Sequence, residues 1–95
     1  MSKFDISPGV EKKLRDKHQV EPKEVLQCFE NCDGQYLIDT REDHKTDPQT
    51  MWFVAETNKR RLLKVCFMQI DGVVTIKTAY DANSDEIRIY KKFAY

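Results

Sequence analysis

The sequence contains no long apolar run, and this absence excludes a helix that crosses a membrane. Its mean hydropathy is −0.68. Nowhere does the apolar character persist over the roughly 18 residues that a membrane-spanning helix needs. The opening residues Met1–Asp5 also lack the apolar core of a secretory signal. We therefore expect a cytoplasmic protein with no membrane partner.

An excess of charge of either sign is also missing. Sixteen Lys and Arg residues balance sixteen Asp and Glu residues. A neutral chain does not attract a polyanion over long distances, so any nucleic-acid surface must be a local cluster of basic side chains. A chain of 95 residues buries only about 60–65% of its unfolded surface, which limits it to one core. We expect a single domain over residues 1–95 and no cofactor.

Cysteine is scarce, with only Cys28, Cys32 and Cys66. An odd number of cysteines without an export signal favours reduced thiols over a disulfide framework. Cys28 and Cys32 are four residues apart and can share a helix face, but no CxxC pair or matching histidine spacing completes a zinc site. We expect buried structural cysteines and no metal site.

The N-terminal third predicts two short helices. Ser7-Pro8-Gly9 is a typical helix start, because Ser caps free N–H groups and Pro is tolerated in the first turn. This first helix is expected to run to about Lys17. Glu21-Pro22 begins the second helix, and Asp33-Gly34 ends it.

The rest of the chain changes to the pattern of a sheet. Apolar runs at 36–38, 51–55, 62–68 and 73–80 predict four strands. Asp71-Gly72 between the last two runs predicts a tight hairpin. Asn83 with Glu86 three residues later forms a capping-box pattern, which favours a C-terminal helix over a strand. The fold class is therefore α+β, with two N-terminal helices, a four-stranded antiparallel meander sheet and a C-terminal helix.

The polar segment Asp39–Thr50 contains the densest set of reactive groups. His44 has a side chain that can transfer protons near neutral pH, and Arg41 can hold a phosphate. The alternatives are a solvated connection between two strands, or a divalent metal site formed by Asp43, His44 and Asp47.

Basic side chains gather in two further regions. They are Lys12, Lys13, Arg15, Lys17 and His18 on the first helix, and Lys59, Arg60, Arg61 and Lys64 near the second hairpin, extended by Lys77 and Arg88. Trp52, Phe53 and Tyr80 are available to stack a base beside them. The alternative interpretation is that each cluster is an ordinary charged surface.

Several runs resemble the BrnT toxin family. They are Val10–Val25 with its Lys17-His18 pair, Arg61–Val65, and Ile76–Tyr80 followed by Glu86 and Tyr90. BrnT proteins resemble RelE and ParE toxins in fold and are ribonucleases neutralised by an antitoxin. The resemblance therefore implies a RelE/BrnT-like fold, RNA as substrate and an antitoxin partner.

By position, the residues that match the family motifs are Lys17, His18, Arg61 and Tyr90. Gln19 stands where the family has Gly, and Tyr80 stands where it has an arginine. A narrower group of short proteins shares Asp39–His44 and Thr78–Tyr80, and its members often carry the label ADP-ribosyl-(dinitrogen reductase) hydrolase. That activity is one alternative, and a non-catalytic interaction module is another.

The leading hypothesis is a toxin-type protein that acts on RNA, or an inactive relative of one. In a cleavage reaction, Arg41, Arg61 or Lys77 would stabilise the scissile phosphate, and His44 or Tyr80 would move the proton. The expected RNA-binding residues are Lys12, Lys13, Lys17, His18 and Lys64.

Overall fold

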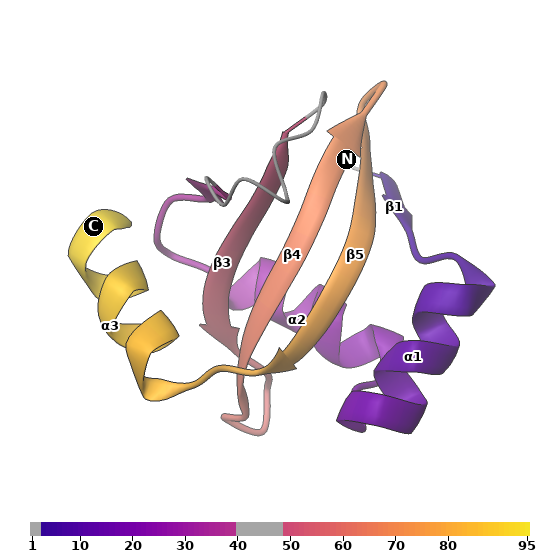
Figure 1. The fold of residues 1–95 in the computed structure, drawn as a ribbon, viewed down its shortest axis with the longest axis horizontal. Coiled ribbons are helices and arrows are strands. Elements are labelled where there is room, and N and C mark those ends of the chain that lie inside the picture. Colours follow the sequence, from indigo (N-terminus) through magenta and orange to yellow (C-terminus); the bar gives the residue numbers. More distant parts are fainter. Residues whose placement is uncertain (1–2, 40–48) are drawn as a thin grey trace.

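The computed structural model describes residues 3–39 and 49–95. Its elements, in chain order, are β1 (Lys3–Asp5), α1 (Pro8–His18), α2 (Pro22–Asn31), β2 (Leu37–Ile38), β3 (Thr50–Glu56), β4 (Leu62–Ile70), β5 (Val73–Asp81) and α3 (Ser84–Phe93). The predicted α+β class is confirmed, including the two N-terminal helices and the C-terminal helix (Figure 1).

The sheet has the order β1-β5-β4-β3-β2. Strands β2 to β5 form the predicted antiparallel meander. A fifth strand, β1, was not predicted, and it pairs in parallel with β5 through Lys3↔Val73 to Asp5↔Thr75. Its three residues are all exposed, so no alternation of apolar and polar residues marks them in the sequence.

The helices lie on both faces of the sheet. Helix α1 packs against β5, and α2 packs against β3 and β4, behind the sheet in Figure 1. The ring of Phe29 on α2 contacts Phe53 and Phe67 at centroid distances of 4.7 and 5.2 Å. Neighbouring strand residues point to opposite faces, so Trp52 and Lys64 lie on the other face, beside α3.

The core lies between the sheet and the two N-terminal helices. Its largest fully buried side chains are Phe53, Phe67, Leu14, Leu63, Ile76, Val20, Val25, Val65 and Cys28. Cys28 and Cys66 are buried as predicted, whereas Cys32 is half-buried. Within the described ranges, no helix combines the length and the apolar composition needed to cross a bilayer.

The left-handed turn predicted to end α2 at Asp33-Gly34 does not form in the structure. Helix α2 ends at Asn31, and its C-cap Cys32 is extended with φ −73° and ψ 118°. Neither Asp33 nor Gly34 has a positive φ.

The predicted start of α1 and the predicted hairpin turn form in the structure. The Ser7 side chain accepts a hydrogen bond from the Val10 N–H at the start of α1. At the β4–β5 hairpin, Asp71 and Gly72 have φ angles of 51° and 80°. Two consecutive residues with positive φ are typical of the tight hairpin turn.

Gly9 and Gly72 both have room for a side chain, but they differ in backbone conformation. A methyl group at Gly9 in α1 or at Gly72 would meet no atom within 4 Å, but only Gly72 has a positive φ. We expect Gly72→Ala to lower the free energy of unfolding by about 1–2 kcal/mol, and Gly9→Ala to raise it by about 0.5 kcal/mol. Urea unfolding checks both, and equal effects of the same sign would contradict the assignment.

Candidate functional site

Three polar side chains meet on the sheet face opposite α1 and α2. Lys64 of β4 and Tyr80 of β5 are cross-strand partners, and Glu86 comes from α3. The Tyr80 hydroxyl donates to Glu86 Oε2 at 2.7 Å, and Lys64 Nζ lies 3.0 Å from the same oxygen. The side chains of Lys64 and Glu86 are only 8% and 15% exposed. We call Lys64, Tyr80 and Glu86 the polar cluster.

The start of α3 holds Glu86 in place. Its Oε1 accepts the backbone N–H of Asn83 at 3.0 Å, and the Asn83 side chain accepts the Glu86 N–H at 2.8 Å. This capping box leaves Oε2 free to bind Lys64 and Tyr80. A carboxylate in the first turn is also stabilised by the helix dipole.

The protonation states of the polar cluster follow from its contacts. Burial raises the pKa of Glu86, but the hydrogen bonds from Asn83, Tyr80 and Lys64 outweigh it, and the net pKa is lowered. Burial lowers the pKa of Lys64, but interactions with Cys66 and Glu86 leave it raised. Burial and the bond to Glu86 raise the pKa of Tyr80. At neutral pH the cluster is an ion pair with a protonated tyrosine.

An apolar groove opens beside the polar cluster. It has a volume of about 760 Å³ and is lined by Tyr36, Leu37, Ile38, Asp39, Trp52, Lys64, Glu86, Ile89 and Phe93. Lys64 Nζ lies over the Trp52 ring, 4.7 Å from its centroid. A few polar groups in a largely apolar hollow of this size are typical of ligand sites.

His18 lies next to the polar cluster. It is the last residue of α1, and its ring centroid is 5.6 Å from that of Tyr80. Burial, followed by the charges of Lys13 and Lys17, lowers its pKa. Its imidazole is therefore mainly neutral at pH 7 and can accept a proton.

The other predicted cations occupy different environments. Lys12, Lys13 and Lys17 are exposed on α1. Lys77 is exposed at a bulge, because Cys66 pairs with Thr78 and Phe67 with Ile76. The structure thus brings together Lys64, Tyr80 and His18, and it places Lys77 on an exposed part of β5.

Arg61 is engaged by the fold through all five of its N–H groups. Nε and Nη2 donate to the two Asp81 oxygens at 2.8 and 3.1 Å. Nη2 also donates to the His18 carbonyl at 2.8 Å, and Nη1 donates to the Gln19 carbonyl at 2.6 Å and to Glu24 at 3.4 Å. The guanidinium thereby joins the end of α1, the start of α2 and the end of β5. We call this arrangement the Arg61 clasp.

Gln19 forms the backbone turn that ends α1, next to the Arg61 clasp. It ends α1 in the left-handed conformation, with φ 51° and ψ 42°, and its N–H bonds to the Leu14 carbonyl. Glycine is the usual residue at such a position.

Arg41 and His44 lie outside the described residues, as do Asp43 and Asp47 of the alternative metal site. Glu86 was missed as a site residue. The sequence carried a signal for it, because the Asn83–Glu86 capping box fixes its position. Comparison of the chain with protein-family models and with curated proteins found no match.

The Arg61 clasp predicts a structural cost. We expect Arg61→Ala to lower the free energy of unfolding by about 2–3 kcal/mol, because it leaves carbonyl and carboxylate acceptors without donors. Arg88→Ala is the matched control, since its side chain is 69% exposed and, among the described residues, has one ion pair, with Asp85 at 3.4 Å. The control should change stability by less than about 0.5 kcal/mol. If urea unfolding shows similar losses of stability for Arg61→Ala and Arg88→Ala, the Arg61 clasp does not have the predicted stabilising effect.

The lowered pKa of Glu86 predicts a pH dependence. The Glu86 carboxylate stabilises the fold fully above the ordinary glutamate pKa, about 4.3. This stabilisation is lost as the pH falls through the pKa of Glu86 in the folded protein, which is lower. We expect Glu86→Gln to be less stable than wild type by about 2 kcal/mol at pH 6. The difference in stability between the two proteins should shrink as the pH falls below the ordinary glutamate pKa.

The neighbouring Asp85 provides the control for this experiment, because its side chain is 80% exposed. Asp85→Asn should follow the wild-type stability curve between pH 3 and pH 6. A constant gap between wild type and Glu86→Gln over this range would show that the charge on Glu86 is not what stabilises the fold.

Proposed function

We propose that this chain is a cytoplasmic, toxin-type protein that acts on RNA, as its resemblance to the BrnT and RelE toxins implies. One observation carries the proposal: a histidine with a lowered pKa lies against Tyr80, where the basic helix α1 meets the polar cluster. The fold agrees with the proposal, because two N-terminal helices, an antiparallel meander and a C-terminal helix form a RelE-like layout.

RNA binding is proposed to rest on α1. Lys12, Lys13 and Lys17 are exposed there, and each can neutralise one phosphate. Because the formal net charge of the chain is zero, attraction to RNA depends on this local cluster. Trp52 lines the groove next to the polar cluster and offers an aromatic ring to an unstacked base.

The proposed chemistry begins with proton removal by His18. A neutral imidazole at this position can accept the proton of a ribose 2′-hydroxyl while the 2′-oxygen attacks the adjacent phosphorus and the 5′-oxygen leaves with a proton from water. A positioned base of this kind contributes about 10²–10⁴-fold to rate. Tyr80 stays protonated because its pKa is raised. Its one hydroxyl proton is donated to Glu86, so its oxygen is left to accept a hydrogen bond from the substrate. The Lys64–Glu86 pair holds its hydroxyl through the bond at 2.7 Å.

The cation for the scissile phosphate is proposed to be Arg41 or Lys77. Arg61 was the third candidate from the sequence, but its five donors are committed to the Arg61 clasp. Lys77 is exposed on β5, the same strand that carries Tyr80. Expression of the chain in a bacterial host should then arrest growth and degrade bulk RNA.

Substitution of His18 separates cleavage from binding. In an assay with purified protein and single-stranded RNA, we expect His18→Ala to lower the cleavage rate at least about 100-fold. RNA affinity should change less than about twofold, because the lysines of α1 remain. Wild-type activity in His18→Ala, or no cleavage by the wild-type protein, would contradict the catalytic part of the proposal.

Substitution of the helix lysines tests binding. Replacing Lys12, Lys13 and Lys17 by Gln together should weaken RNA binding and reduce the slope of log affinity against log salt by about 2 units. Replacing Lys3, Lys23 and Lys92 by Gln removes the same charge from other exposed positions. If both triple variants lose affinity equally, α1 is not the RNA surface.

A further inference from the structure

Half of the outer edge of β3 has no neighbouring strand among the described residues. Strand β2 pairs with β3 only through Leu37↔Trp52 and Ile38↔Met51, whereas β3 continues to Glu56. The chain before β2 turns away from this edge, since the Gln35 N–H donates to the Ala94 carbonyl at 2.9 Å. Among the described residues no strand therefore pairs with the edge from Phe53 to Glu56, and at its Glu56 end the Asn31 side chain contacts the edge.

The peptide groups of Val54 point toward this open edge. The Asn31 side chain donates to the Glu56 carbonyl at 2.9 Å, so that carbonyl faces away from β4. Strand residues two apart direct their peptide groups to the same side, which places the Val54 N–H and carbonyl at the edge as well. Within residues 3–39 and 49–95, no hydrogen-bond partner meets either group.

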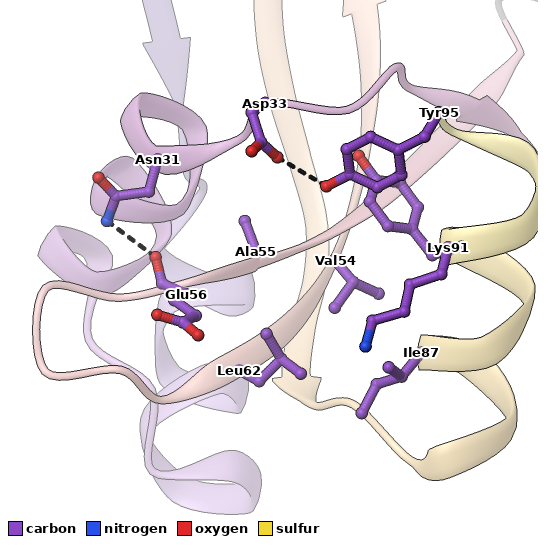
Figure 2. A pocket seen from close by; sticks show the side chains of 10 residues that line it. Asn31, Asp33, Val54, Ala55, Glu56, Leu62, Ile87, Lys91 and Tyr95 are labelled. Atoms are coloured by element: carbon purple, nitrogen blue, oxygen red, sulfur yellow. Dashed lines mark hydrogen bonds between the residues drawn. The ribbon is translucent and has the colours of Figure 1, made fainter.

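A cavity of about 390 Å³ lies over this edge (Figure 2). Its floor includes Val54, Ala55 and Glu56, with Asn31 and Asp33 from the end of α2 on one side and Ile87, Tyr90 and Lys91 of α3 on the other. Tyr95 closes one end by donating to Asp33 Oδ1 at 2.6 Å. The volume is within the range of about 300–1,000 Å³ typical of ligand sites.

The two sides of the cavity differ in chemistry. Val54 lies on the α3 face of the sheet, where Leu62 and Ile87 add apolar surface and Lys91 adds an ammonium group. Asp33 supplies a carboxylate on the α2 side. Side chains of an added strand would alternate between these sides. A basic residue facing Asp33, between two apolar residues facing Val54 and Ile87, fits this arrangement.

We propose that this cavity, the edge cavity, binds an extended segment of another polypeptide as a short added strand beside Val54–Glu56. The Val54 N–H and carbonyl pair with the backbone of the segment, and Asp33 selects a basic residue flanked by apolar ones. Addition of a strand to an open edge gives affinity through main-chain bonds and specificity through alternate side chains. The edge cavity and the proposed RNA surface on α1 use different residues.

The test uses the peptide acetyl-Thr-Val-Lys-Val-Thr-amide and the full chain labelled with ¹⁵N. We expect saturable shifts of the Val54 and Glu56 amide signals, and at least tenfold slower hydrogen exchange at Val54 when the site is filled. A peptide with Glu in place of Lys should bind at least tenfold more weakly. A peptide N-methylated at the central residue and both valines should not bind. Absence of shifts at Val54, or equal binding of the three peptides, would overturn the proposal.

Two protein variants separate charge from packing. We expect Asp33→Asn to weaken binding of the Lys peptide at least threefold and to reduce the difference in affinity between the Lys peptide and the Glu peptide. Tyr95→Phe removes the hydroxyl that donates to Asp33 but keeps the carboxylate, so it should keep the preference. Loss of the preference in Tyr95→Phe, or its full retention in Asp33→Asn, would overturn the assigned role of Asp33.

Discussion

Glu86 is the side chain on which the arrangement of α3 most depends. One carboxylate oxygen caps the first turn of the helix, and the other binds Lys64 and Tyr80 on neighbouring strands. The far end of the chain is held by the Tyr95–Asp33 bond and by the Ala94 carbonyl, which accepts the Gln35 N–H. Helix α3 is thus fixed at both ends, and its position shapes both the apolar groove and the edge cavity.

Burying the polar cluster costs free energy of folding, but the cluster fixes the geometry of its side chains. Removing Lys64 and Glu86 from water is costly, and a buried ion pair recovers this cost only when further hydrogen bonds satisfy both partners. Here the Asn83 N–H and the Tyr80 hydroxyl supply those bonds to the carboxylate, while the Trp52 ring faces the ammonium. The result is one fixed orientation for Tyr80, which a catalytic or binding role would need.

Arg61, just before β4, contacts the end of α1, where His18 lies next to Tyr80. The Arg61 clasp binds the His18 carbonyl at the end of α1, and the His18 ring lies beside Tyr80. Arg61, which the sequence predicted to stabilise a phosphate, is engaged in the structure by two backbone carbonyls and two carboxylates. A guanidinium with all five donors engaged has none left for a substrate.

Local patterns in the sequence determined most of the fold. Ser7, Asn83 with Glu86, and Asp71-Gly72 act within a few residues of themselves, so caps and turns could be predicted from them. Strand β1 could not, because its three exposed residues carry no pattern and pair with a segment about seventy residues away. That pairing exists only once β5 has formed.

For the candidate site too, the sequence identified single residues, and the tertiary structure decided how they are arranged. The sequence predicted Lys64 and His18 as RNA-binding residues and Tyr80 as a catalytic residue but gave no reason to join them, since they lie on three different elements. Tertiary structure decided that Glu86 links two of them, that Arg61 is occupied by the clasp, and that Val54 faces an open edge. These properties depend on distances between remote segments, whereas residue type and spacing describe only what lies along the chain.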